Sequence, residues 1–393
     1  MPLRPPAGFI SANYDPLKNP DAPTGVSATG GDAQAEVSFT APSNVGGSAI
    51  TAYYAVSNPG QITSSGASSP VTVTGLSNGT AYTFQVWALN SFGPGPFSAA
   101  SGSVTPATRG VFGGGFTPAS NVIDYISIAS AGNATDFGDL TVGTRYIASC
   151  SSATRGLFGG GNSSNAKTSL ITYITISTTG NSTSFGNLIA ANQEPTGCAN
   201  STRGLFAGGE TSAGSVNVIQ YVTIATTGNA TDFGDLTRTT RGAGACASTT
   251  RGLFAGNYVG SNVIDYVTIA TTGDATDFGD LTISVGAIAG CSSSTRGLFG
   301  GGTGAQTYNV IGYVTIASTG NATNFGDLTV GRYYLASTSS QTRGVFGGGN
   351  DGLGGVNVID YVTIASTSNA TDFGDLTVAR YELAACSNAH GGL

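Results

Sequence analysis

A repeated unit that contains the triplet Thr-Arg-Gly constrains the fold of this chain more than any other feature. Six units follow one another, and their marker arginines stand 45 to 48 residues apart. These arginines are Arg109, Arg155, Arg203, Arg251, Arg296 and Arg343. Each unit contains short runs of β-favouring residues separated by Gly, Asn and Asp. Each unit therefore predicts four short strands with turns between them.

The composition supports strands and excludes a mostly helical fold. Only 9% of the residues are charged and 61 are glycine, while glutamate occurs four times and lysine twice. Strong helix formers are therefore scarce, whereas Thr, Val, Ile, Tyr and Phe, which suit strands, are plentiful. The hydrophobic share of 39% is high enough for a folded core. We therefore expect an all-β fold.

The length of the unit predicts a six-bladed β-propeller over residues 107–393. A period of about 40 to 50 residues with four strands per unit is typical of propeller blades, which pack around an axis. The first unit lacks a small strand before Arg109, and the chain has a spare one at residues 381–387. We expect this spare strand to pair with residues 109–115 and to complete the first blade.

The units resemble kelch repeats from residue 109 to about residue 390. Paired glycines, as at residues 113–114, match the kelch double glycine, and a tyrosine follows downstream. A phenylalanine stands where kelch repeats have tryptophan. An arginine before the small strand occurs only in some units, at Arg145, Arg332 and Arg380. The resemblance implies the propeller architecture and leaves the function open, because kelch propellers serve many roles.

Two kinds of repeated side chain are predicted to be structural. Repeated arginines usually bond to carbonyls or carboxylates between blades, and we expect this of the six marker arginines. A cysteine on the small strand is expected to act as a small buried hydrophobic residue. These cysteines are Cys150, Cys198, Cys246, Cys291 and Cys386, with Thr338 at the sixth place. Free thiols indicate assembly in a reducing cytoplasm.

Residues 21–106 are predicted to form a separate β-sandwich. Alternating apolar and polar residues, as in 50–56 and 82–88, recur at the spacing of sandwich strands. The run LSNGTAY at 76–82 resembles the corner between strands E and F of fibronectin type III domains, with Tyr82 as the corner tyrosine. Modules of that family mostly serve as spacers or adhesive units.

Residues 1–20 are a separate, proline-containing segment with the run PPAGFISANYDPL at 5–17. This run resembles the N-terminal segment of structural proteins from marine tailed bacteriophages. Apolar side chains stand in this otherwise polar leader, at Phe9, Ile10, Tyr14 and Leu17. One interpretation is a tail without fixed structure. The other is an extended anchor whose four apolar side chains dock on another virion protein.

The residues that carry chemistry exclude most classes of enzyme and cofactor. His390 is the only histidine, so a multi-histidine metal site is excluded. A net charge of −7 argues against nucleic-acid binding. The start of the chain lacks the apolar region of a signal peptide, and no 18-residue apolar run predicts a membrane span. We expect no catalytic residue, metal, cofactor or enzymatic activity.

The binding residues are expected on one face of the propeller. The turns between first and second strands and between third and fourth strands are nearly identical in all units. The other face carries the second-to-third loops and the crossovers between blades, which vary in length and chemistry. Selectivity requires such differences, so ligand contact is predicted at Tyr258, Tyr308, Tyr333, Tyr334 and Lys167.

These features predict a non-enzymatic virion structural protein, a phage tail or capsid fiber or a decoration protein. Its propeller would attach to a glycan or protein of the host surface, and its N-terminal segment to other virion proteins, with a homo-oligomer as a further option. The virion is the expected location, after assembly in the host cytoplasm. The alternatives are a propeller enzyme that acts on glycans and a cellular kelch-type scaffold for protein interactions.

Overall fold

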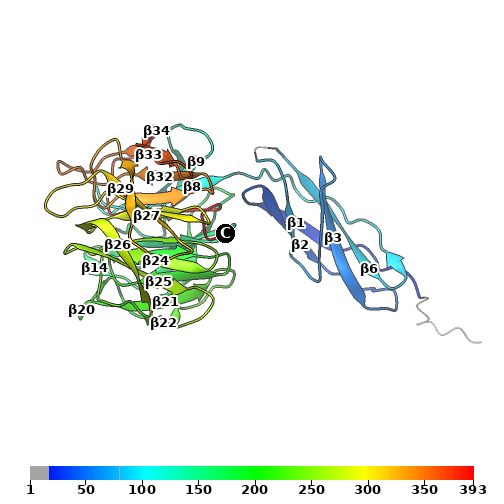
Figure 1. Ribbon diagram of the computed structural model, residues 1–393. Coiled ribbons are helices and arrows are strands. Elements are labelled where there is room, and N and C mark those ends of the chain that lie inside the picture. Colours follow the sequence, from blue (N-terminus) through cyan, green and yellow to red (C-terminus); the bar gives the residue numbers. More distant parts are fainter. Residues whose placement is uncertain (1–16, 79) are drawn as a thin grey trace, which may run out of the picture. The chain divides into compact units, whose positions relative to one another are not determined.

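The computed structural model describes residues 17–78 and 80–393, and every regular element among them is a β-strand. The all-β prediction is therefore confirmed. The chain divides into two compact units, one ending at Ala107 and the other spanning Thr108–Leu393 (Figure 1). The described part of the chain contains no helix with the length and apolar character needed to cross a membrane.

The N-terminal unit consists of two antiparallel sheets around one core. The first has the order β1 (Thr24–Gly30), β2 (Gln34–Thr40), β5 (Val71–Thr74). The second has the order β4 (Thr63–Gly66), β3 (Ile50–Asn58), β6 (Thr83–Asn90), β7 (Gly93–Pro94). Buried residues alternate with more exposed ones along β2 and β6, because successive side chains of a strand point to opposite faces.

Tyr82 stands at the predicted corner of this unit. Its ring is buried in the core beside Phe84, and its hydroxyl accepts a hydrogen bond from the Ser77 amide at 3.1 Å. This bond ties the run before β6 to the tyrosine, as the corner prediction requires.

The C-terminal unit contains six four-stranded antiparallel sheets, here numbered I to VI along the chain. Sheet I has the order β35 (Ala384–Ser387), β8 (Arg109–Gly113), β9 (Val122–Ser127), β10 (Thr135–Asp139). Sheet II has the order β11 (Ala148–Ser151), β12 (Arg155–Gly159), β15 (Leu170–Thr175), β16 (Thr183–Asn187). Sheet III has the order β17 (Thr196–Ala199), β18 (Arg203–Ala207), β21 (Val218–Thr223), β22 (Thr231–Asp235).

The three remaining sheets repeat this order. Sheet IV has β23 (Gly244–Ala247), β24 (Arg251–Ala255), β25 (Ser261–Thr268), β26 (Thr276–Val285). Sheet V has β27 (Ala289–Ser292), β28 (Arg296–Gly300), β29 (Val310–Thr315), β30 (Thr323–Asp327). Sheet VI has β31 (Ala336–Ser339), β32 (Arg343–Gly347), β33 (Val358–Thr363), β34 (Thr371–Asp375). Two small hairpins follow second strands: β13 (Asn162–Ser163) with β14 (Ala166–Lys167), and β19 (Glu210–Thr211) with β20 (Gly214–Ser215).

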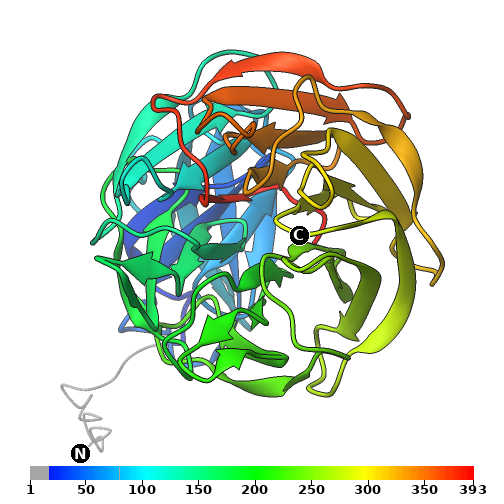
Figure 2. The ribbon, with the colours of Figure 1, turned by 90° about the vertical axis from the view of Figure 1, so that its left-hand side faces the viewer.

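The last strand of the chain completes the first sheet. In β35, Ala384 pairs with Gly113 and Ser387 with Gly110 of β8. The predicted pairing of the C-terminal strand with residues 109–115 is confirmed. The first strands of successive sheets lie beside one another, and β35 lies beside both β31 and β11 (Figure 2).

The marker arginines join each sheet to the next. Arg155, for example, donates from Nη1 to the carbonyls of Ile224 and Ala225 in sheet III, at 3.1 and 2.7 Å. Its guanidinium also lies 4.8 Å from the ring centre of Tyr173 in its own sheet. Each of the other five arginines likewise donates to a carbonyl of the next sheet. The prediction that these arginines bond between repeats is confirmed.

The cysteines fill the space beside a glycine of the next sheet. All five are buried free thiols. A Cβ atom added to Gly156 in sheet II would lie 2.7 Å from Sγ of Cys386 in sheet I. The same relation recurs around the unit, with Thr338 facing Gly110 at the sixth place. The glycine of the Arg-Gly motif is therefore explained by the sulfur or methyl group that occupies its side-chain space.

One part of the repeat alignment is wrong. Arg332 and Arg380 are fully buried and bind Asp360 and Asp124 at 2.6 and 2.7 Å. Arg145 is not equivalent to them, because it stands one residue later in its unit and has a side chain that is about a quarter exposed.

The third arginine that pairs with a third-strand aspartate is Arg238, which is two residues earlier in its unit and whose side chain is about a quarter exposed. It reaches the Gly256 and Val263 carbonyls and Asp265, the same kinds of group that Arg332 reaches in sheet VI. Sheets II, III and V have Thr172, Gln220 and Gly312 in place of the aspartate. An arginine is thus present where the third strand carries an aspartate.

Candidate ligand-binding site at the axial ring

Six residues from the six crossovers form a hydrogen-bonded ring, which we call the axial ring. Its members each stand four residues before the cysteine position of a first strand: Tyr146, Glu194, Gly242, Ala287, Tyr334 and Glu382. The amide of each donates to the carbonyl of the preceding member, and Tyr146 donates to Glu382, over distances of 2.8 to 3.2 Å. All six have a positive φ between 52° and 61°. This left-handed conformation turns each crossover toward its neighbour.

The side chains of the axial ring line a pocket of about 400 Å³, including its open mouth. Its walls are completed by apolar residues of the six crossovers, such as Ile147, Pro195 and Leu335. Gly242 and Ala287 contribute little bulk. The aromatic ring of Tyr334 lies 5.3 Å from that of Tyr146, measured between ring centres. The pocket therefore has aromatic walls on one side and space on the other.

Two buried carboxylates give the pocket its polar character. Glu194 is 7% exposed and Glu382 is 5% exposed. Among the described residues, Oε2 of each carboxylate has no hydrogen-bond partner. A buried acceptor without a donor costs about 1–3 kcal/mol, so each of these two oxygens lowers the stability of the folded protein.

Burial dominates the acid–base properties of the pocket. Desolvation raises the pKa of Glu382 to about 7, against smaller lowering effects from Tyr146 and Arg145. Desolvation also raises the pKa of Glu194, opposed by Arg241 and by a hydrogen bond from the Tyr334 hydroxyl. The pKa of the Tyr334 hydroxyl is itself raised, first by burial and then by the charge of Glu194. Burial raises the pKa of Tyr146 as well, so Tyr146 and Tyr334 both remain protonated hydrogen-bond donors at neutral pH.

Two arginines border the carboxylates without binding them closely. Nη1 of Arg145 is 3.9 Å from Oε2 of Glu382, and Nη1 of Arg241 is 3.9 Å from Oε1 of Glu194. We call these contacts the loose pairs, because 3.9 Å is too long for a hydrogen bond. Each arginine side chain is about a quarter exposed, so the solvent reaches the outer side of each loose pair.

A tighter ion-pair network surrounds Glu210. This carboxylate binds Lys167 Nζ at 2.8 Å and contacts Arg241 closely. The hydrogen bond from Lys167 is the main reason that the pKa of Glu210 is lowered. Lys167 was predicted as a ligand-binding residue, and the structure places its ammonium group in this network.

The structure brings three of the predicted tyrosines together. Tyr334 belongs to the axial ring, Tyr333 lies 5.7 Å from it, and Tyr258 stacks on it at 6.1 Å between ring centres. The guanidinium of Arg241 also lies against Tyr258, 4.5 Å from the centre of its ring. Tyr258 is 41% exposed, so part of its ring remains open to the solvent.

The other predicted residues do not join this cluster. Tyr308 is partly buried and packs against the core cluster that contains Leu281 and Val285. Of the predicted anchor, Phe9, Ile10 and Tyr14 lie outside the described residues, and Leu17 is 65% exposed.

Sequence reasoning missed Tyr146, Glu382, Arg145 and Arg241 as site residues. The available signal was the constant spacing of four residues before each cysteine position. Reading that position across the six units gives Tyr, Glu, Gly, Ala, Tyr and Glu, a set without a common chemical type. A comparison of the six units that looks for identical residues therefore does not detect this position.

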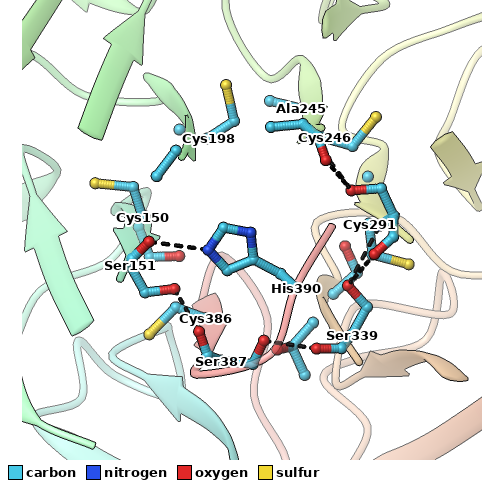
Figure 3. A pocket seen from close by; sticks show the side chains of 18 of the residues that line it. Cys150, Ser151, Cys198, Ala245, Cys246, Cys291, Ser339, Cys386, Ser387 and His390 are labelled. Atoms are coloured by element: carbon cyan, nitrogen blue, oxygen red, sulfur yellow. Dashed lines mark hydrogen bonds between the residues drawn. The ribbon is translucent and has the colours of Figure 1, made fainter. Parts of the chain in front are cut away.

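The opposite end of the first-strand bundle is filled by the C-terminal residues. His390 lies in the middle of a pocket bordered by the first strands, and the five cysteine sulfurs point away from it (Figure 3). Nδ1 of His390 accepts a hydrogen bond from the Gly392 amide at 3.1 Å. Nε2 therefore carries the proton and donates to the Ser151 carbonyl at 2.9 Å. Burial lowers the pKa of this histidine.

Neither end of the bundle offers a metal centre. Within residues 17–78 and 80–393, no group of three or more His, Cys, Asp or Glu side chains is arranged to hold a metal ion. The cysteine sulfurs are engaged against glycines of neighbouring sheets, and burial raises the pKa of Cys198, Cys291 and Cys386 to about 12.

Comparison with known proteins assigns the N-terminal unit to a class of domain. Residues 21–103 match the Fibronectin type III domain, in agreement with the two sheets and the corner tyrosine of that unit. No curated protein matches the chain.

Proposed function

We propose that Thr108–Leu393 is a six-bladed β-propeller of the kelch-like type. Three observations support this proposal: the uniform strand order of sheets I to VI, the pairing of β35 with β8, and the hydrogen-bonded axial ring. Blades in such a fold cover each other's faces, which accounts for the cores that combine residues of two successive sheets, such as Phe137 with Ile174.

We further propose that the protein is a non-enzymatic structural protein of a phage virion, in which the propeller attaches to a glycan or protein of the host surface. The observation that carries this proposal is the contrast between the two ends of the sheets. At one end the repeated Asn side chain serves the scaffold: Oδ1 of Asn181, for example, accepts a hydrogen bond from the Asp139 amide of the preceding sheet. At the other end main-chain hydrogen bonds link the axial ring, and its side chains line a pocket in which two carboxylate oxygens have no partner among the described residues.

The N-terminal segment supplies the virion part of the proposal. Phe9, Ile10, Tyr14 and Leu17 would anchor the chain to another virion protein, and the fibronectin type III domain would separate that anchor from the propeller. Mass spectrometry of purified particles tests this part directly. The proposal requires the protein at stoichiometric amounts on particles and fails if washed particles lack it.

Attachment is tested with the labelled full-length protein on host cells. Tyr258→Ala removes an exposed ring beside the axial pocket and should weaken binding about tenfold, the effect of losing a contact of about 1.4 kcal/mol. Thr231→Ala, an exposed change at the repeated-turn end, is the matched control and should bind as the wild type does. Equal binding of all three proteins, or loss in the control alone, would contradict the assignment of the binding end.

A glycan-cleaving propeller enzyme is the second candidate, and one observation favours it. Glu194 and Glu382 line the same pocket, and a carboxyl group with a pKa near 7 suits a general acid. Release of reducing sugar from host glycans, abolished by Glu382→Gln, would favour the enzyme over the adhesin.

A further inference from the structure

The axial pocket holds two hydrogen-bond acceptors that have no partner among the described residues. Oε2 of Glu194 lies beside Gly242, where an added Cβ atom would be 3.5 Å from it. This oxygen and Oε2 of Glu382 have no hydrogen-bond partner among the described residues. On the solvent side of each carboxylate, the guanidinium of a loose pair stands at 3.9 Å. In the Arg145–Glu382 pair the unpartnered Oε2 faces Nη1, so this pair offers an acceptor beside a donor. Nη1 of Arg241 already binds Glu210, so at Glu194 only the acceptor Oε2 is available.

Three carboxyl groups and three cationic groups border the pocket. Glu194, Glu382 and Glu210 face Arg145, Arg241 and Lys167. A cationic ligand would satisfy the carboxylates and repel the guanidiniums, and an anionic ligand would do the reverse. A hydroxyl group accepts and donates at once, so it can accept from Arg145 and donate to Glu382, while a second hydroxyl donates to Oε2 of Glu194.

The aromatic side chains supply the apolar contact that such a ligand needs. Tyr146 and Tyr334 line the pocket, and Tyr258 extends the aromatic surface to the outside. A sugar ring has an apolar face of C–H groups that packs on tyrosine at low entropy cost, while its hydroxyl groups remain at the edge.

We propose that the axial pocket binds a neutral, hydroxyl-rich ligand, the terminal sugar ring of a host glycan, whose hydroxyl groups donate to Oε2 of Glu194 and to Oε2 of Glu382. This inference deepens the proposed attachment function and rests on it. The raised pKa values of both carboxyl groups result mainly from desolvation. Desolvation is expected where an oxygen has no hydrogen-bond donor until a ligand binds. The ligand hydroxyl groups supply these donors without adding charge to the site.

The test uses the full-length protein and methyl glycosides of glucose, galactose and mannose as probes, followed by saturation-transfer NMR and titration calorimetry. At least one neutral glycoside should bind. Glu194→Gln and Glu382→Gln should weaken its binding by about tenfold or more, since each replaces a charged acceptor. Glu36→Gln, a change in the N-terminal unit, is the control and should leave binding unchanged.

Charged probes separate this proposal from its competitors. Glucosamine and glucuronic acid should bind more weakly than the best neutral glycoside. Tighter binding of either one, absence of binding by all neutral glycosides, or unchanged binding in both glutamate variants would overturn the proposal. If a glutamate variant does not fold, Arg145→Met replaces it in the test. This substitution removes the donor of one loose pair at a partly exposed position.

Host-cell binding keeps this inference distinct from the proposed function. If the glutamate variants bind cells as the wild type does while Tyr258→Ala does not, the attachment function stands and the sugar pocket is wrong. If no variant changes cell binding but glycosides still bind in the pocket, the sugar site stands and its role in attachment is wrong.

Discussion

The main-chain amide of Tyr146 donates a hydrogen bond of 2.9 Å to the carbonyl of Glu382. These residues belong to the first and last crossovers of the C-terminal unit, so this bond joins its two ends in the same way as the pairing of β35 with β8. The first and last parts of the unit are therefore joined both by strand pairing and by the axial ring.

Removal of residues 380–393 should abolish cooperative unfolding of the C-terminal unit. The deletion leaves the edge of β8 unpaired and leaves Asp124 buried without Arg380. Differential scanning calorimetry of the truncated and intact chains measures the effect. A sharp transition of the C-terminal unit at the temperature of the intact chain would contradict this account of closure.

Gly156→Ala should destabilise the protein by about 1–3 kcal/mol, because the new methyl group overlaps Sγ of Cys386. Cys386→Ala in the same chain should recover a large part of that loss, and a double-mutant cycle from urea denaturation measures the coupling. The control is Gly228→Ala, where an added Cβ atom meets nothing within 4 Å. Equal losses at both glycines would show that backbone freedom, rather than the sulfur, explains the motif.

Arg332→Val should cost about 3–5 kcal/mol, because it leaves Asp360 buried and unpaired. The double variant Arg332→Val with Asp360→Gly reproduces the pair that sheet V uses, Val285 and Gly312, and should recover most of the stability. Chemical denaturation of the three proteins provides the comparison. A double variant as unstable as the single one would show that the arginine acts through its carbonyl contacts and not through the charge pair.

Stability should depend on pH through Glu382. The pKa of this carboxyl is raised from 4.5 to about 7 in the folded state, so the folded protein binds the proton more tightly than the unfolded chain. This contribution to stability is fully present below pH 4.5 and is lost as the pH rises to about 7. At about 1.4 kcal/mol for each pKa unit, the loss is roughly 3 kcal/mol.

Glu382→Gln should remove this pH dependence, and subtraction of its stability profile from that of the wild type isolates the Glu382 contribution. His390 acts in the opposite direction, because its lowered pKa makes the folded state lose stability as the pH falls below the usual value of 6.5. The difference profile cancels the histidine, which both proteins share. A flat difference between pH 4.5 and 7 would rule out the raised pKa.

The repeat made the strand order and the closing strand predictable, because turn residues and apolar runs recur with a constant spacing. The axial ring was not predictable in the same way. Its members share a backbone conformation, and neither Tyr146 nor Ala287 is a residue type that indicates a positive φ. Arg238 and Arg332 show a second limit: they reach equivalent groups from positions two residues apart in the repeat, so alignment does not match them.

Main-chain hydrogen bonds link all six members of the axial ring, whatever side chain each of them carries. A codon change at one of these six positions alters the chemistry of the pocket while the hydrogen bonds that hold the crossovers persist, provided that the new residue tolerates a positive φ. Under the attachment function proposed above, lineages that carry this scaffold would diversify their target by substitution at a few central codons. Directed evolution confined to the same codons offers a compact library for retargeting the protein.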